Sequence, residues 1–274
     1  MNLASRQTPT IPLSELSPNF AAGSLGGGVG LRRFGTFESD LAVDFAAANP
    51  ATLVTKLLEQ CIVVSDVSLP KDFFRTLSIG KRLECLLTLA AGEERTPFDF
   101  QFNCGGCGAE LEIELTLDEI AAIQSEADLI DVINVEVGGE PLTFRKPTGD
   151  DQESWAEMVF RDEKEAARAL IGNLAVNAFL KIRAKDLDVI DEAMDEADPL
   201  VNFLCRVTCA ECGVGNEFSV DLCDVALSIL ARQRKQLIVM VHKLASRYHW
   251  SEKDIFEIPD WRRREYLDLI AAGR

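Results

Sequence analysis

Two Cys-x-x-Cys-Gly segments that lie 105 residues apart restrict the fold of this chain more than any other feature. The first, "CGGCG", begins at Cys104, and the second, "CAECG", begins at Cys209. Alternating apolar residues flank both segments, which is typical of half-buried strands. The stretches "FDFQFNCGGCGAELEIELTLDEI" and "VNFLCRVTCAECGVGNEFSVDLCDV" align without a gap through their shared core. The sequence therefore predicts an internal repeat of a strand, a cysteine turn and a second strand.

The cysteines of the two turns form a candidate metal site. Cys104, Cys107, Cys209 and Cys212 offer four thiolates, the ligand set of many tetrahedral structural Zn²⁺ centres. We expect the turns to face each other in a zinc ribbon and to join segments that 101 residues separate. Because four protein ligands leave no position for water, the predicted zinc is structural. Glycine after the second cysteine suits a tight backbone turn.

Other interpretations of the cysteine turns stay open. A thioredoxin-like redox pair sits at the start of a helix after a strand, whereas strands are predicted on both sides of each turn here. Iron–sulfur binding and reduced cysteines that only pack are the remaining alternatives. The other four cysteines lie in apolar or strand positions, where we expect packed thiols. These are Cys61, Cys85, Cys205 and Cys223.

The apolar period changes from helical to alternating along the chain, which predicts an α+β fold with the duplicated ribbon embedded among helices. Asn49 and Pro50 predict a helix start before the repeat. "VINVEVGGEPLTFRK" has the pattern of a hairpin, and residues 150–182 are predicted as helix, as is "KDLDVIDEAMDEADP". The expected segments are a flexible N-terminal arm (1–40), a helical segment (41–97), the first ribbon half (98–123), a hairpin-plus-helices insert (124–200), the second ribbon half (201–227) and C-terminal helices with a basic aromatic interface (228–274).

Charge and hydropathy disfavour several classes of protein. The net charge of −17 would repel phosphate backbones, which argues against a general nucleic-acid binder. No run of 18 apolar residues and no secretory pattern is present, so we expect a cytoplasmic protein with reduced cysteines and no membrane span. Residues 231–274 are different, with ten Lys/Arg and six Asp/Glu. This basic segment either docks on the chain's own acidic body, docks on an acidic partner or is a solvated helical surface.

The C-terminal region predicts a long helix followed by a capping box, in which Ser251 is the cap and Asp254 lies three residues on. Trp, Tyr and Arg, the residues enriched in interface hot spots, gather around and after this cap. The predicted partner interface comprises Tyr248, His249, Trp250, Trp261, Arg262, Arg263, Arg264 and Tyr266. Packing of the terminal helices onto the body is an equal alternative for the aromatic residues. No nucleophile–base pair is visible, so we do not expect an enzyme.

The stretch "VHKLASRYHWSEKDIFEIPDWRRREYLDLI" resembles the C-terminal signature of a family encoded in phage-tail and contractile-injection-system gene clusters. The matching residues are Val241, His242, Leu244, Ala245, Tyr248, Trp250, Ser251, Glu252, Ile255, Arg262, Arg263, Tyr266 and Leu267. "LSIGKRLECLLTLAAG" and "EADPLVNFLCRVTCAECG" are similar to the segments that the family places before its cysteine turns. Neither turn has the proline often found there, although the cysteines are kept.

The resemblance implies a relation to T4-type baseplate or hub-assembly components. We therefore expect a non-catalytic structural or chaperone-like component of the baseplate or hub of a phage-like contractile injection system, stabilised by structural Zn²⁺. The expected partners are other baseplate, hub or tail subunits, with no small-molecule substrate. The alternative is a zinc-ribbon accessory factor that binds nucleic acid.

Overall fold

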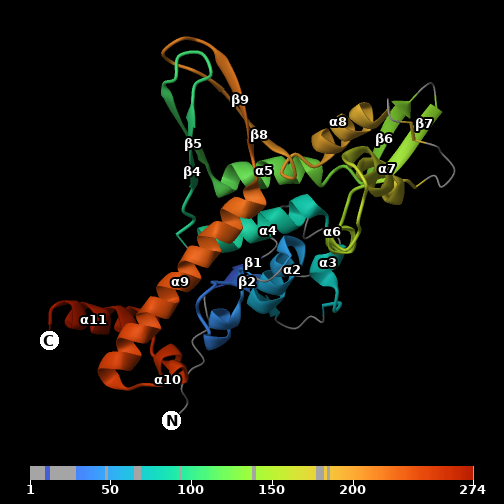
Figure 1. Ribbon diagram of the computed structural model, residues 1–274. Coiled ribbons are helices and arrows are strands. Elements are labelled where there is room, and N and C mark those ends of the chain that lie inside the picture. Colours follow the sequence, from blue (N-terminus) through green and yellow to red (C-terminus); the bar gives the residue numbers. More distant parts are fainter. Residues whose placement is uncertain are drawn as a thin grey trace.

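Helices and small antiparallel hairpins make up the protein, which confirms the predicted α+β class (Figure 1). The computed structural model describes residues 10–12, 29–46, 49–64, 69–92, 94–137, 140–176, 182–183 and 186–273. Among these residues, no helix is both long and apolar enough to cross a membrane.

The N-terminal part combines a three-stranded antiparallel sheet with short helices. Its elements are β1 (Thr10–Pro12), β2 (Val29–Arg32), the 3-10 helix η1 (Glu38–Ala42), α2 (Pro50–Cys61), β3 (Ile62–Val64), α3 (Phe73–Thr76) and α4 (Ile79–Ala91). The predicted start of α2 is confirmed, since the side chain of Asn49 accepts a hydrogen bond from the amide of Ala51.

The boundary of the expected N-terminal arm is corrected. Residues 1–9 and 13–28 lie outside the described residues, but residues 29–40 form β2 and the turn into η1. All four residues of β2 are buried, because the strand lies between β1 and β3 in the sheet. The glycine-rich composition that predicted the arm does not report this pairing with a distant strand.

Helix α4 is the centre of the main core, and all thirteen of its residues are buried. It packs against α2 and against two helices that each follow a hairpin with a cysteine turn, α5 (Leu117–Ala127) and α9 (Leu222–Tyr248). Arg82 is buried in this core and donates hydrogen bonds to the backbone oxygens of Phe74 and Ala51. The charged residues of α4 are therefore part of the core and not a solvated face.

The internal repeat is present as two hairpins with the same register. The hairpins are β4 (Phe98–Asn103) with β5 (Glu110–Leu115), and β8 (Phe203–Thr208) with β9 (Gly215–Val220). Phe98 pairs with Leu115, and Phe203 pairs with Val220, so both partners shift by 105 residues. The following helices, α5 and α9, also start 105 residues apart. The structure thus repeats a unit of hairpin and helix.

The insert between the hairpins has its own apolar core. Its elements are β6 (Val132–Val137), β7 (Glu140–Arg145), α6 (Gly149–Ala156), α7 (Glu163–Leu174) and α8 (Leu187–Ala197). The continuous helix predicted over residues 150–182 is wrong, because α6 ends at Ala156 and Asp162 caps a new helix by accepting from the amide of Glu165. Residues 177–181 lie outside the described residues.

The chain ends in three helices that share a small cluster of buried residues. After α9 come α10 (Glu252–Glu257) and α11 (Asp260–Ala271). His249 ends α9 in a left-handed conformation with φ of 56°, and the predicted capping box of Ser251 and Asp254 is confirmed. Val241, Leu244 and Ile255 form the buried centre of this helical end.

Candidate metal centre

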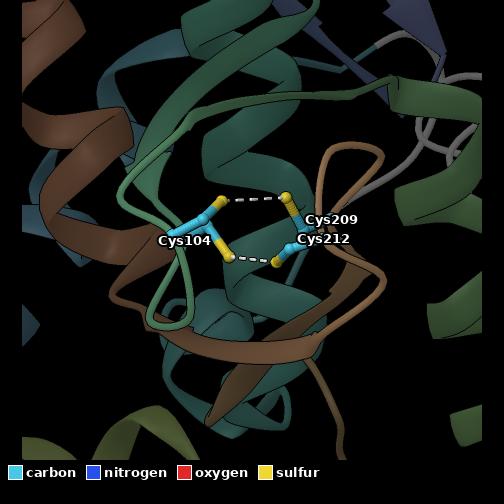
Figure 2. Close-up of side chains that lie close together, drawn as sticks. Cys104, Cys209 and Cys212 are labelled. Carbon is cyan, nitrogen blue, oxygen red and sulfur yellow. Dashed lines mark hydrogen bonds between the residues drawn. The ribbon is translucent and has the colours of Figure 1, made fainter.

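The two cysteine turns lie side by side at the ends of the two hairpins, where all four predicted ligands meet (Figures 1 and 2). Their four sulfur atoms lie within 4.8 Å of one another. The Sγ atoms of Cys104 and Cys212 are 3.6 Å apart, and those of Cys107 and Cys209 are 3.7 Å apart. Each close pair therefore joins one hairpin to the other, as the dashed lines in Figure 2 show.

The distances exclude disulfides between the close pairs and are compatible with a metal site. A disulfide places its sulfurs about 2.05 Å apart, so these four cysteines are free thiols. Four sulfurs at about 2.3 Å from one tetrahedral Zn²⁺ would lie about 3.8 Å from each other. The two close pairs match that spacing to within a few tenths of an ångström. Cys104 and Cys209 are buried, and Cys107 and Cys212 are exposed, so the cluster has one side towards the solvent.

The backbones of the two turns have the same hydrogen bonds. The amide of Cys104 donates to the oxygen of Ala109, and that of Gly108 donates to the oxygen of Cys104. Both bonds recur 105 residues later, from Cys209 to Val214 and from Gly213 to Cys209. Gly108 and Gly213 have φ of 75° and 74°, a conformation that other residues adopt at a cost. The glycines identified in the sequence are therefore required by the turn.

We expect Gly213→Ala to lower the free energy of unfolding by about 1–2 kcal/mol, because alanine is strained at positive φ. A Cβ at this position would meet no atom within 4 Å, so the effect isolates the backbone conformation. Gly215→Ala is the matched control, since Gly215 has equal space and no positive φ. Denaturant unfolding of both variants should show a loss for Gly213→Ala alone. Equal stabilities of the two variants would contradict this account of the turn.

Aromatic side chains from both hairpins pack next to the cysteine cluster. The rings of Phe102 on β4 and Phe218 on β9 stack with centroids 4.2 Å apart and planes 3° apart. Together with Leu111, they adjoin the buried cysteines Cys104 and Cys209. Apolar contact between the hairpins therefore holds the two turns close together without a metal ion.

Asn216 is a site residue that the sequence analysis missed. Its side-chain oxygen accepts a hydrogen bond of 2.8 Å from the amide of Gly105, and its side-chain nitrogen lies 3.6 Å from the sulfur of Cys104. It thus ties the second hairpin to the first turn and lies beside the sulfur of Cys104. The available signal was a break in the repeat, since the aligned position in the first half is the apolar Leu111.

Hydrogen bonds, desolvation and neighbouring sulfurs shift the pKa values of Cys104, Cys107 and Cys212 in different directions. The backbone N–H groups of Cys107 and Gly106 stabilise the thiolate of Cys104 and lower its pKa to about 6. The pKa of Cys212 is raised to about 12, since desolvation and the neighbouring sulfurs outweigh the amide of Val214, which favours the thiolate. The pKa of Cys107 is also raised above its ordinary value. Near neutral pH the site therefore holds both thiolate and thiol groups.

These acidities predict how metal affinity depends on pH. Because the thiols of Cys107 and Cys212 are protonated at neutral pH, Zn²⁺ must displace at least two protons from them. The association constant should therefore rise by a factor of about 100 or more between about pH 6.5 and about pH 7.5. Competition against a chromophoric chelator at the two pH values measures this ratio. An affinity that does not change with pH would contradict the assignment of these thiols as ligands.

The remaining cysteines lie apart from the cluster. Cys61, Cys85 and Cys205 are buried and Cys223 is partly buried, as expected for packed thiols. Burial raises the pKa of Cys61 to about 12 and that of Cys223 to about 11. Neither thiol is therefore a reactive nucleophile at neutral pH.

The C-terminal residues predicted as a partner interface fall into two groups. Tyr248, Trp250 and Tyr266 pack on one another, with ring centroids 4.6 to 5.3 Å apart. Arg263 is 4% exposed and lies over the ring of Phe256. These four side chains therefore hold the terminal helices together. The exposed members are His249, Trp261, Arg262 and Arg264, for which contact with a partner stays a prediction.

No family model, curated protein or solved structure matches the chain. Membership of the family implied by the C-terminal signature stays a prediction.

Proposed function

We propose that this is a non-catalytic structural protein in which Zn²⁺, held by Cys104, Cys107, Cys209 and Cys212, joins two halves of a zinc ribbon. The observation that carries the proposal is the cluster of four free thiols, two from each turn, with cross-hairpin distances of 3.6 and 3.7 Å. Metal binding by a site that is absent from the unfolded chain contributes directly to folding.

The position of the cluster suggests what the metal stabilises. The ribbon halves bracket the insert of residues 124–200, so a metal between them fixes both ends of that insert against the main core. Four cysteine ligands also leave no coordination site for a substrate. We therefore assign the metal a structural role.

We further propose that the protein acts as a component or assembly factor of the baseplate or hub of a contractile injection system. The C-terminal signature supports this role. Several signature residues, including Val241, Leu244 and Ile255, are buried where α9 meets α10, so the motif specifies a helical module. This module presents Trp261, which is 56% exposed, beside Arg262 at the molecular surface. Trp and Arg are suited to anchor a protein–protein contact.

Cross-linking mass spectrometry on contractile particles and their assembly intermediates would test the assembly role. We expect cross-links from Lys253, next to this module, to a baseplate or hub subunit. Trp261→Ala combined with Arg262→Ala should remove them while zinc content stays unchanged. The proposal fails if the protein is absent from particles and intermediates and its deletion leaves particle assembly normal.

Nucleic-acid binding is the second candidate function. The observation that favours it is α9, which carries five basic residues and no acidic residue between residues 225 and 251. The net charge of −17 opposes it. Phosphate contacts by α9 would make binding to a DNA or RNA duplex fall steeply with salt. Failure to bind either duplex at low salt would exclude this function.

A further inference from the structure

Five acidic residues lie on the outward side of α8, next to Val189, which is 49% exposed. They are Asp188, Asp191, Glu192, Asp195 and Glu196, which we call the acidic face. The opposite face of the helix, with Leu187 and Ile190, is buried in the core of the insert. Among the described residues, this buried side is where α8 packs on the core of the insert.

The acidic face forms one wall of an open groove with a volume of about 760 Å³. Helix α5 and the start of β8 complete the groove. The groove has apolar lining from Ile123 on α5, from Ile130 just after α5, and from Phe203 and Leu204 on β8. Ile130 and Leu204 are each 37% exposed, so apolar surface remains open to the solvent between the charges.

The charges of the acidic face have no cationic partner among the described residues. Asp195 accepts a hydrogen bond from Asn202, but no ion pair reaches any of the five carboxylates. Arg206, at the edge of the groove, is already paired with Glu217 at 2.6 Å. Desolvation and the neighbouring Asp195 and Asp188 raise the pKa of Asp191, as expected for crowded like charges. A cationic group in the groove would relieve this repulsion.

Helix α9 has the opposite character. Arg232, Lys235, Val239, Lys243 and Arg247 lie along one exposed side of the helix, which we call the basic stripe. Val239 is 46% exposed and the neighbouring Ile238 is 42% exposed, so the stripe also offers apolar surface. None of its four cations forms an ion pair with a described residue. It is therefore complementary to the groove in both charge and polarity.

The two surfaces belong to different parts of the molecule. Figure 1 shows α8 beside β6 and α7, whereas α9 extends from the ribbon towards α10 and α11. The basic stripe therefore does not cover the chain's own acidic face. We propose that the basic stripe of one copy docks in the groove between α5 and α8 of a second copy.

This contact is head-to-tail, because it joins two different surfaces, and it can be repeated from copy to copy. The net charge of −17 opposes association at long range. At physiological salt, however, screening acts beyond about 8 Å, so the closely apposed charges dominate. The proposal goes beyond the assembly role and does not depend on it or on the metal.

Sedimentation of the full-length, zinc-loaded protein over a range of concentrations tests the contact. We expect reversible association at about 0.15 M salt that weakens at about 0.6 M salt. Asp191→Lys with Asp195→Lys should lower the association constant by about tenfold or more, as should Lys235→Glu with Lys243→Glu. A mixture of these two variants should associate again. The intact basic stripe of the first variant can dock in the intact acidic groove of the second.

Asp99→Lys with Glu112→Lys is the matched control. Both residues are exposed on the first hairpin, and the two substitutions change the net charge as much as Asp191→Lys with Asp195→Lys does. This control should associate at least as well as the wild-type protein. Circular dichroism and zinc content identify any variant that fails to fold. If the double lysine variant does not fold, the conservative double variant Asp191→Asn with Asp195→Asn takes its place. A wild-type protein that is monomeric at all concentrations would overturn the proposal. So would an association that the control weakens equally, or a basic stripe that binds nucleic acid while the chain stays monomeric.

Discussion

Cys104→Ser and Cys209→Ser are each expected to release zinc and to lower the free energy of unfolding by more than about 4 kcal/mol, as is typical when a structural metal site is lost. Each substitution removes a buried ligand from the cluster and leaves three thiols, one of which lies 3.6 or 3.7 Å from the lost sulfur. Denaturant unfolding with and without added Zn²⁺ measures the effect. The wild-type protein should gain stability from Zn²⁺, and the variants should gain little.

Cys223→Ser provides the matched control for these variants. It makes the same chemical change in a partly buried cysteine outside the cluster. This variant should keep its zinc and its zinc-dependent gain in stability. If Cys104→Ser and Cys223→Ser lose the same amount of stability, and neither loses metal, the four cysteines are packing residues and the ribbon hypothesis is wrong.

The second large effect is expected from Asp40→Ala, which should lower the free energy of unfolding by about 3–5 kcal/mol. Asp40 is fully buried and accepts two hydrogen bonds from the guanidinium of Arg32, at 2.7 and 2.8 Å. It also accepts from the amide of Gly35 and the side chain of Gln60. Alanine would leave the buried charge of Arg32 without its counter-ion, and the amide of Gly35 without this acceptor.

Asp118→Ala is the control for this pair. Asp118 also pairs with an arginine, Arg95, but the two side chains are 89% and 51% exposed. Exposed pairs contribute about 0–1 kcal/mol, so this variant should remain close to the wild-type protein. Equal unfolding curves for Asp40→Ala and Asp118→Ala would show that the buried pair does not hold β2 and η1 in place.

The internal repeat made the two cysteine-turn hairpins and their meeting point predictable. Matching cysteine turns in matching apolar patterns specify both the strand pairing and which side chains converge. The meeting of the four cysteines could therefore be predicted without knowledge of the rest of the fold. The same holds for the helix starts at Asn49 and Ser251, where the cap depends on residues within one turn. Local chemistry was sufficient in each case.

The errors arose where distant residues decide the outcome. Strand β2 is buried because β3, thirty residues later in the chain, pairs with it, and because Arg32 finds Asp40 and the backbone of Gln60. Nothing within the glycine-rich segment itself indicates that pairing. Asn216 likewise gains its role only from the opposite hairpin, where it meets Gly105 and Cys104.

The charge pattern shows a third kind of limit. The sequence reveals that residues 231–274 are basic within an acidic chain, but not which surfaces carry the charge. The structure separates Arg263, which is buried, from the exposed cations along α9. It also shows that the acidic residues of α8 share one face of a groove. The uneven charge along the sequence thus corresponds to two defined surfaces, the acidic face of α8 and the basic stripe of α9.

The central claim is that the four turn cysteines together bind one Zn²⁺. Native mass spectrometry of the purified protein, combined with thiol alkylation before and after chelation, tests it most directly. We predict one zinc per chain, with Cys104, Cys107, Cys209 and Cys212 protected from alkylation until a chelator removes the metal. A metal-free protein in which these four thiols react freely would contradict the claim.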